Sequence, residues 1–133
     1  PKSVPVRADL PVSAAAARAI FIGADRAQES VMNAVAKVSQ NTLYIFLSGD
    51  LDEYGAGLVR GQVDAAIEAH LACDRVVFDF SGVQFMDSTG IGFLIGRYKR
   101  LRRAGTPLYV QSPTPAADRI LSMGGLYSII PKI

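Results

Sequence analysis

Four consecutive residues combine a carboxylate, two hydroxyls and a glycine: Asp87, Ser88, Thr89 and Gly90. The apolar run 76–80 precedes them and a helical pattern over 91–103 follows, so Ser88 is expected on a tight turn between a buried strand and a helix. One role for such a serine is capping, because its oxygen can accept a hydrogen bond from a first-turn amide. The other is a regulated phosphoacceptor, since a helix N-terminus tolerates an added anion.

Two enzyme chemistries fit this stretch poorly. Gly90, Gly92 and Gly96 resemble a dinucleotide-binding loop, but the third glycine is one position late. The next predicted strand also ends without an acid for a ribose hydroxyl. A serine hydrolase is not expected either, because Ser88 lies outside a G-x-S-x-G elbow and the single histidine, His70, lies at the far end of another predicted helix.

Acidic residues at predicted strand ends leave two interpretations. Asp50, Asp52, Asp79 and Asp87 would meet at one sheet edge, where carboxylates can bind a hard metal ion. Helix caps and turn hydrogen bonds are the commoner roles for short acids there, and they are favoured. Cys73 is the single cysteine, which excludes an internal disulfide and a cysteine metal cluster. No metal and no cofactor is therefore expected.

Composition favours one soluble domain. The chain has 133 residues, half of them hydrophobic, and a net charge of +2. Such a balanced charge does not predict nucleic-acid binding, and no apolar run approaches the roughly 20 residues of a membrane span. A cytoplasmic protein with no membrane partner is expected.

Strand and helix patterns alternate through most of the chain. Strands are predicted over 31–38 and 42–48, joined by a hairpin turn at 39–41, and over 75–80, 107–111 and 127–130. Helices are predicted over 55–71, 89–103 and 115–123; Leu58, Val63, Ile67 and Leu71 share the apolar face of the first. This order predicts an α/β fold with a mostly parallel central sheet, an antiparallel edge strand and covering helices.

The helix over 89–103 has two faces. Its apolar stripe, predicted to pack on the sheet, is Ile91, Leu94, Ile95, Tyr98 and Leu101. The opposite side carries Gly92, Phe93, Gly96 and Arg97, and two explanations of the glycines stand equally: close packing on the chain's own sheet, or close approach by another protein with Phe93 as an exposed anchor. The helix macrodipole explains the cluster of cations toward the end of this helix, which consists of Arg97, Lys99, Arg100, Arg102 and Arg103.

Three motifs closely resemble the STAS-domain anti-sigma factor antagonists, above all those of the sporulation sigma-F type. They are F-M-D-S-T-G-I-G at 85–92, G-R-Y-K at 96–99 and M-G-G-L-Y-S-I-I at 123–130, and L-S-G-D-L-D at 47–52 is similar to that family's second-strand signature. The resemblance implies a bacterial switch protein that is not an enzyme. It would bind an anti-sigma factor that is also a serine kinase, release a sigma factor, and be reset by a PP2C-type phosphatase.

The resemblance also implies roles for individual residues. Ser88 would be the phosphoacceptor, and the partner-binding residues would be Asp52, Asp87, Thr89, Gly90, Gly92, Phe93, Gly96 and Arg97. The alternative is a STAS module in another assembly, such as a stressosome-type scaffold or a lipid-transport accessory subunit.

The resemblance covers about residues 32–133, the expected STAS domain spans 31–133, and residues 1–30 have no counterpart in the family. An extended piece at 4–7, a helix at 11–22 and a polar linker are predicted there. This helix either replaces the family's final helix, by circular permutation or by a swap that would form a dimer, or is a simple extension.

Overall fold

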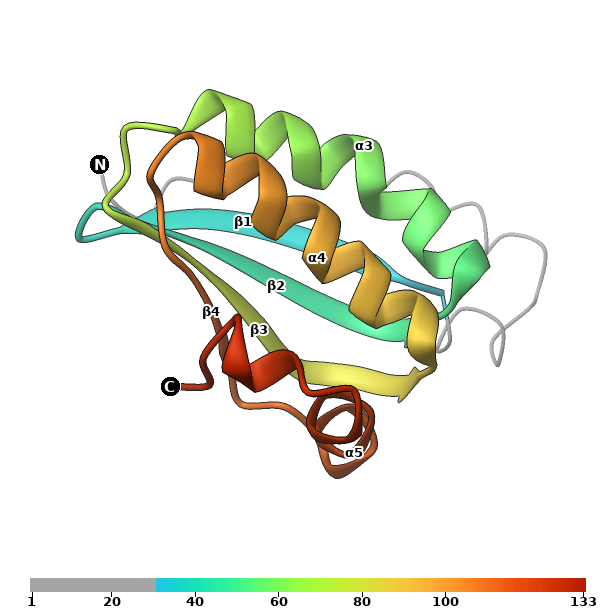
Figure 1. Ribbon diagram of the computed structural model, residues 1–133. Coiled ribbons are helices and arrows are strands. Elements are labelled where there is room, and N and C mark those ends of the chain that lie inside the picture. Colours follow the sequence, from blue (N-terminus) through green and yellow to red (C-terminus); the bar gives the residue numbers. More distant parts are fainter. Residues whose placement is uncertain (1–30) are drawn as a thin grey trace, which may run out of the picture.

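The computed structural model describes residues 31–133, and its centre is a four-stranded sheet (Figure 1). The expected elements and swap in residues 1–30 lie outside this range. The strands are β1 (Asn33–Ser39), β2 (Thr42–Leu51), β3 (Arg75–Met86) and β4 (Leu108–Gln111), in that order across the sheet. β1 is antiparallel to β2, whereas β2, β3 and β4 are parallel. The predicted fold class is therefore confirmed.

The β1–β2 hairpin follows from two residues. Gln40 and Asn41 both have positive φ angles, 50° and 61°. Two consecutive positive φ values match the right-handed twist of the flanking strands, and asparagine tolerates this conformation better than most residues. The turn sets the register that pairs Ser39 with Thr42.

Two long helices lie side by side across one face of the sheet: α3 (Glu53–Ala69) and α4 (Ser88–Arg103) (Figure 1). Fully buried side chains of the middle strands, such as Ile45 and Phe78, face them in the core. The predicted apolar face of α3 needs two corrections. Leu58 is exposed and Val59 takes its place in the core, and Leu71 lies beyond the end of the helix at Ala69. Val59, Val63 and Ile67 follow one another at intervals of four residues and form the stripe that is buried.

Ion pairs join α3 and α4 along their exposed seam. The Arg100 guanidinium donates two hydrogen bonds to Glu68, with 2.8 Å between Nη2 and Oε1. Arg97 Nε lies 2.9 Å from Asp64 Oδ1. Two of the cations that the sequence assigned to the macrodipole therefore also pair with acids on the neighbouring helix.

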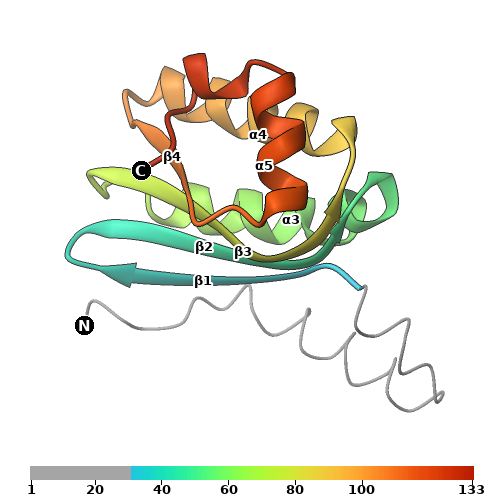
Figure 2. The same cartoon turned by 90° about the horizontal axis from the view of Figure 1, so that it is seen from below.

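The C-terminal part packs along the β3–β4 side of the sheet. Helix α5 (Pro115–Met123) contacts β3 and the 3-10 helix η1 (Leu126–Ser128), and the chain ends beside β4 (Figure 2). The strand predicted at 127–130 was wrong. Gly125 has φ +71°, and the amides of Ile129 and Ile130 both donate to Leu126 O, which closes a tight turn in place of extended backbone. A single bridge to Val110 forms only at Lys132.

Candidate functional site

The site lies where β2 and β3 end together. Leu51 pairs with Met86, so the next residues, Asp52 and Asp87, follow neighbouring parallel strands. Each aspartate then caps the helix that it precedes. Asp52 Oδ1 accepts a hydrogen bond from Gly55 N at 2.8 Å, and Asp87 Oδ1 accepts one from Thr89 N at 2.9 Å. Two capped helix N-termini thus stand at the same edge of the sheet.

Ser88 is the first residue of α4, and its side chain is exposed. Thr89 beside it is half-buried. The capping role that the sequence allowed for Ser88 belongs instead to Asp87. The Ser88 hydroxyl is therefore available to solvent at a helix N-terminus, where the dipole favours an anion.

Gly90 is buried and serves packing. A Cβ at this position would lie 2.6 Å from Met86 Cε and 3.1 Å from Leu51 Cδ2. The first turn of α4 can therefore approach the strand ends only because the residue has no side chain. Its expected place on a partner-binding surface is not supported by its burial.

Gly92 and Gly96 behave differently from Gly90. A Cβ built on either would meet no atom within 4 Å. Close packing on the chain's own sheet, one of the two explanations left open by the sequence, is therefore wrong for both. The two glycines leave the α4 backbone accessible along the side that starts at Ser88, since positions four apart share a helix face.

Phe93 is not the exposed anchor that the sequence suggested, because only 2% of the residue is exposed. Its ring packs edge-on against Phe78 of β3, with 6.3 Å between centroids. Arg97 is also drawn inward: its guanidinium lies 4.8 Å from the Phe93 ring centroid, and Nη1 donates to Phe93 O. Burial lowers the pKa of Arg97, while Asp64 opposes that shift. Both side chains hold α4 in place.

Acidic residues that the sequence placed at strand ends act as hydrogen-bond acceptors. Asp79 Oδ1 accepts hydrogen bonds from Ser81 N and Oγ, and Oδ2 accepts one from Gln111 Nε2. Within residues 31–133 no three His, Cys, Asp or Glu side chains are arranged to hold an ion. Asp52, Asp79 and Asp87 thus have the capping and turn roles that the sequence analysis favoured.

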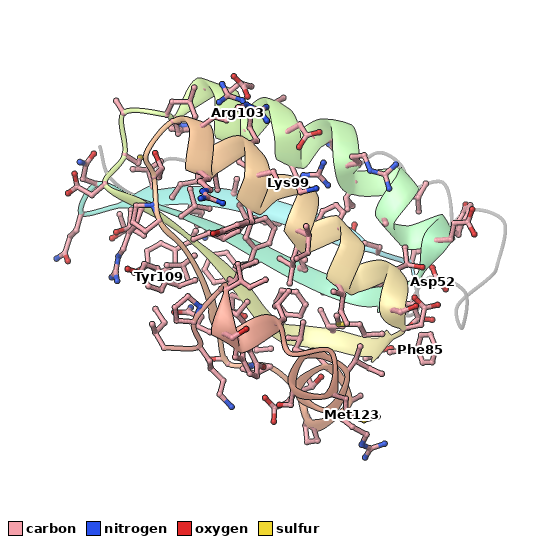
Figure 3. The ribbon with its side chains drawn as sticks, viewed as in Figure 1. Asp52, Phe85, Lys99, Arg103, Tyr109 and Met123 are labelled. Atoms are coloured by element: carbon pink, nitrogen blue, oxygen red, sulfur yellow. The ribbon has the colours of Figure 1, made fainter. Side chains whose placement is uncertain are left out.

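The sequence analysis did not predict three exposed apolar residues near the corner where β2 and β3 end and α3 and α4 begin. They are Tyr54, Phe85 and Met123. Phe85 and Met123, like Asp52, lie toward the end of the molecule where α4 begins (Figure 3). For Phe85 a signal existed, because it precedes the buried Met86 in a strand, where neighbouring side chains point to opposite faces. The other two come from separate helices, and only the fold relates them to Ser88.

The described helices include none long and apolar enough to span a bilayer.

Comparison with known proteins identifies the fold. The anti-sigma F factor antagonist of Paenibacillus polymyxa is 38% identical over 92 residues, covering 69% of this chain and 78% of that relative. The solved structure of the anti-sigma factor antagonist SpoIIAA in its unphosphorylated form aligns with a TM-score of 0.63 at 24% identity, over 77% of this chain and 88% of that one.

The phosphorylated form of SpoIIAA, a Bacillus cell fate determinant, aligns with a TM-score of 0.57 at 24% identity, over 77% of this chain and 91% of that one. At this identity the two structures establish the fold. The profile of the STAS domain matches residues 33–133, which is most of the chain. The chain therefore belongs to the STAS domain family.

Proposed function

We propose that this protein is an anti-sigma factor antagonist of the bacterial cytoplasm that is switched by phosphorylation of Ser88. It would bind an anti-sigma factor with serine kinase activity and so free a sigma factor. The observation that carries the proposal is the exposed Ser88 hydroxyl at the start of α4, in a chain similar to a named anti-sigma F factor antagonist. The protein supplies the phosphoacceptor and is not itself the enzyme.

The transfer step needs ATP, which the kinase would hold. Ser88 Oγ would form a bond to the γ-phosphorus while the bond from that phosphorus to the ADP oxygen breaks, and the hydroxyl proton would leave to water. The products are phosphoserine and ADP. A PP2C-type phosphatase would restore the hydroxyl by hydrolysis of the phosphate ester.

The phosphate would act mainly on the partner. It adds about −1.5 to −2 charges at neutral pH. The first turns of α3 and α4 and their caps carry Asp52, Glu53 and Asp87 and no lysine or arginine, so these turns offer no cation to pair with it. The N-terminus of α4 tolerates the phosphate, and the fold should persist. A bound kinase would instead place the phosphates of its nucleotide next to the phosphate on Ser88, and the two groups would repel each other.

The test uses the full chain, ATP and a purified anti-sigma kinase from the same genome. Intact mass with peptide mapping should find one phosphate on Ser88 and none in Ser88→Ala. Thr89→Ala is the control for the choice of hydroxyl, because it removes the neighbouring one; its phosphate should still map to Ser88, whatever the effect of the substitution on affinity. In a binding titration Ser88→Ala should stay bound and Ser88→Glu should bind weakly.

Equal affinity of Ser88→Ala and Ser88→Glu would contradict the switch. A stable complex without any phosphate would favour the STAS module of another assembly. If the chain forms no complex with such kinases and also gains no phosphate, the proposed function is refuted.

A further inference from the structure

Three large apolar residues on the elements that meet near the start of α4 are exposed to solvent. The residues are 72% exposed at Tyr54, 49% at Phe85 and 78% at Met123. Tyrosine, phenylalanine and methionine are enriched in protein interfaces, and aromatic residues are common among binding hot spots. A binding partner that covered these side chains would bury their apolar surface.

The fold brings them together from three elements. Tyr54 lies in the first turn of α3, two residues after the Asp52 cap, and Phe85 lies three residues before Ser88 near the end of β3. Met123 is the last residue of α5.

The end of α5 is held against α4 by close packing. A Cβ on Gly124 would lie 2.3 Å from Ile91 Cδ1, so the backbone after Met123 sits directly on the first turn of α4. The positions of the three side chains relative to Ser88 are thus set by a strand end, a helix start and a helix end.

Two glycines on these helices add no side chain to the surface. Gly57 on α3 and Gly92 on α4 both leave open space where a side chain would be. A partner can therefore approach the two helix backbones there while the larger side chains project toward it.

We propose that Tyr54, Phe85 and Met123 are the apolar anchors that seat the anti-sigma kinase on this corner, an inference that rests on the proposed function. A kinase must bring the γ-phosphate of its ATP to Ser88 Oγ, so it has to cover the ends of α3, β3 and α5 that surround this atom. The anchors supply affinity, whereas Ser88 and the two capping aspartates face the nucleotide. Binding and phosphoryl transfer then depend on different residues.

The experiment measures the Kd and the steady-state phosphorylation kinetics of Tyr54→Ser, Phe85→Ser and Met123→Ser with the same kinase. Each substitution should weaken binding roughly tenfold or more. It should raise KM by a similar factor and leave kcat unchanged, because the anchors do not touch the reacting atoms. Ile133→Ser is the matched control: this residue is 53% exposed and lies beside β4 at the chain end, so its Kd should stay within about twofold of wild type.

Thermal unfolding of each variant checks that the fold is intact. Met123→Gln keeps the length of the side chain but removes its apolar character, and it should weaken kinase binding as Met123→Ser does. One outcome would overturn the anchor proposal and leave the proposed function standing. In it, the wild-type chain binds the kinase and is phosphorylated on Ser88, and all three variants have the same Kd and KM as the wild type. A fall in kcat at constant KM would do the same. A wild-type chain that neither binds nor is phosphorylated would overturn both.

Discussion

Gly92→Ala should raise the stability of the protein and lower its affinity for the kinase at the same time. Gly92 lies inside α4, is exposed, and leaves open space where a Cβ would be. Alanine is more favourable than glycine in a helix interior by about 1 kcal/mol. For a domain of roughly 100 residues this corresponds to a rise in Tm of about 4–8 °C.

The loss of affinity has a different cause. Gly92 follows Ser88 by one helical turn on the same face, so a kinase seated on Ser88 would approach the α4 backbone there. A methyl group at this point would push the two surfaces apart. We expect a rise in Kd of about tenfold, which corresponds to about 1.4 kcal/mol.

The assay pairs urea denaturation with a binding titration on the same preparations. Gly61→Ala is the matched control. Gly61 is also an exposed helical glycine with open space where a Cβ would be, and it lies about two turns from the start of α3. It should gain similar stability and bind like wild type. A fall in stability for Gly92→Ala would refute the open space, and an unchanged Kd would refute docking along α4.

Further predictions concern the packing and the caps. Phe93→Ala should lower the free energy of unfolding by about 3–5 kcal/mol, measured by urea denaturation, because the ring is buried; a loss below about 1 kcal/mol would contradict its place in the core. Asp87→Ala should cost about 1 kcal/mol of helix capping in the same assay, whereas Asp87→Asn should restore most of it. Hydrogen bonds from Tyr127 and Lys132 lower the pKa of Asp118, so this carboxylate stabilises the fold above its unfolded pKa. The stabilisation is lost as the pH falls below about 4 and through the lower folded pKa. Asp118→Asn should lack this loss when Tm is measured against pH, and equal acid sensitivity of the two proteins would exclude the coupling.

Most of the sheet and helix order could be predicted because its signals are local. The hairpin depends on Gln40 and Asn41. Helix starts depend on caps such as Asp52 and Asp87, whose carboxylates accept hydrogen bonds from amides no more than three residues away. The similarity to the STAS family, predicted from motifs, is confirmed over residues 33–133. The roles of Ser88 and of its partners stay predictions that the experiments above address.

Phe93 shows why the faces of α4 could not be predicted from one stripe. The apolar spacing at Ile91, Ile95 and Tyr98 implied a single contact with the sheet. In the fold Phe93 packs on the sheet through Phe78. Arg97 pairs with Asp64 of α3 and Ile91 meets the end of α5, so the buried arc of α4 is wider than one stripe. Helical periodicity describes one helix, and it does not count that helix's neighbours.

By itself, the sequence determined most of the elements, their order and the position of Ser88 at a helix start, because capping, turn chemistry and periodicity act within a few residues. The strand expected at 127–130 is the exception. Only the tertiary structure decided that Gly90 is a packing residue, that Gly92 is open, and that Tyr54 and Met123 share a corner with Ser88. These features depend on atoms from distant segments. The parallel pairing of β2 with β3 and the packing of α5 on α4 bring those segments together.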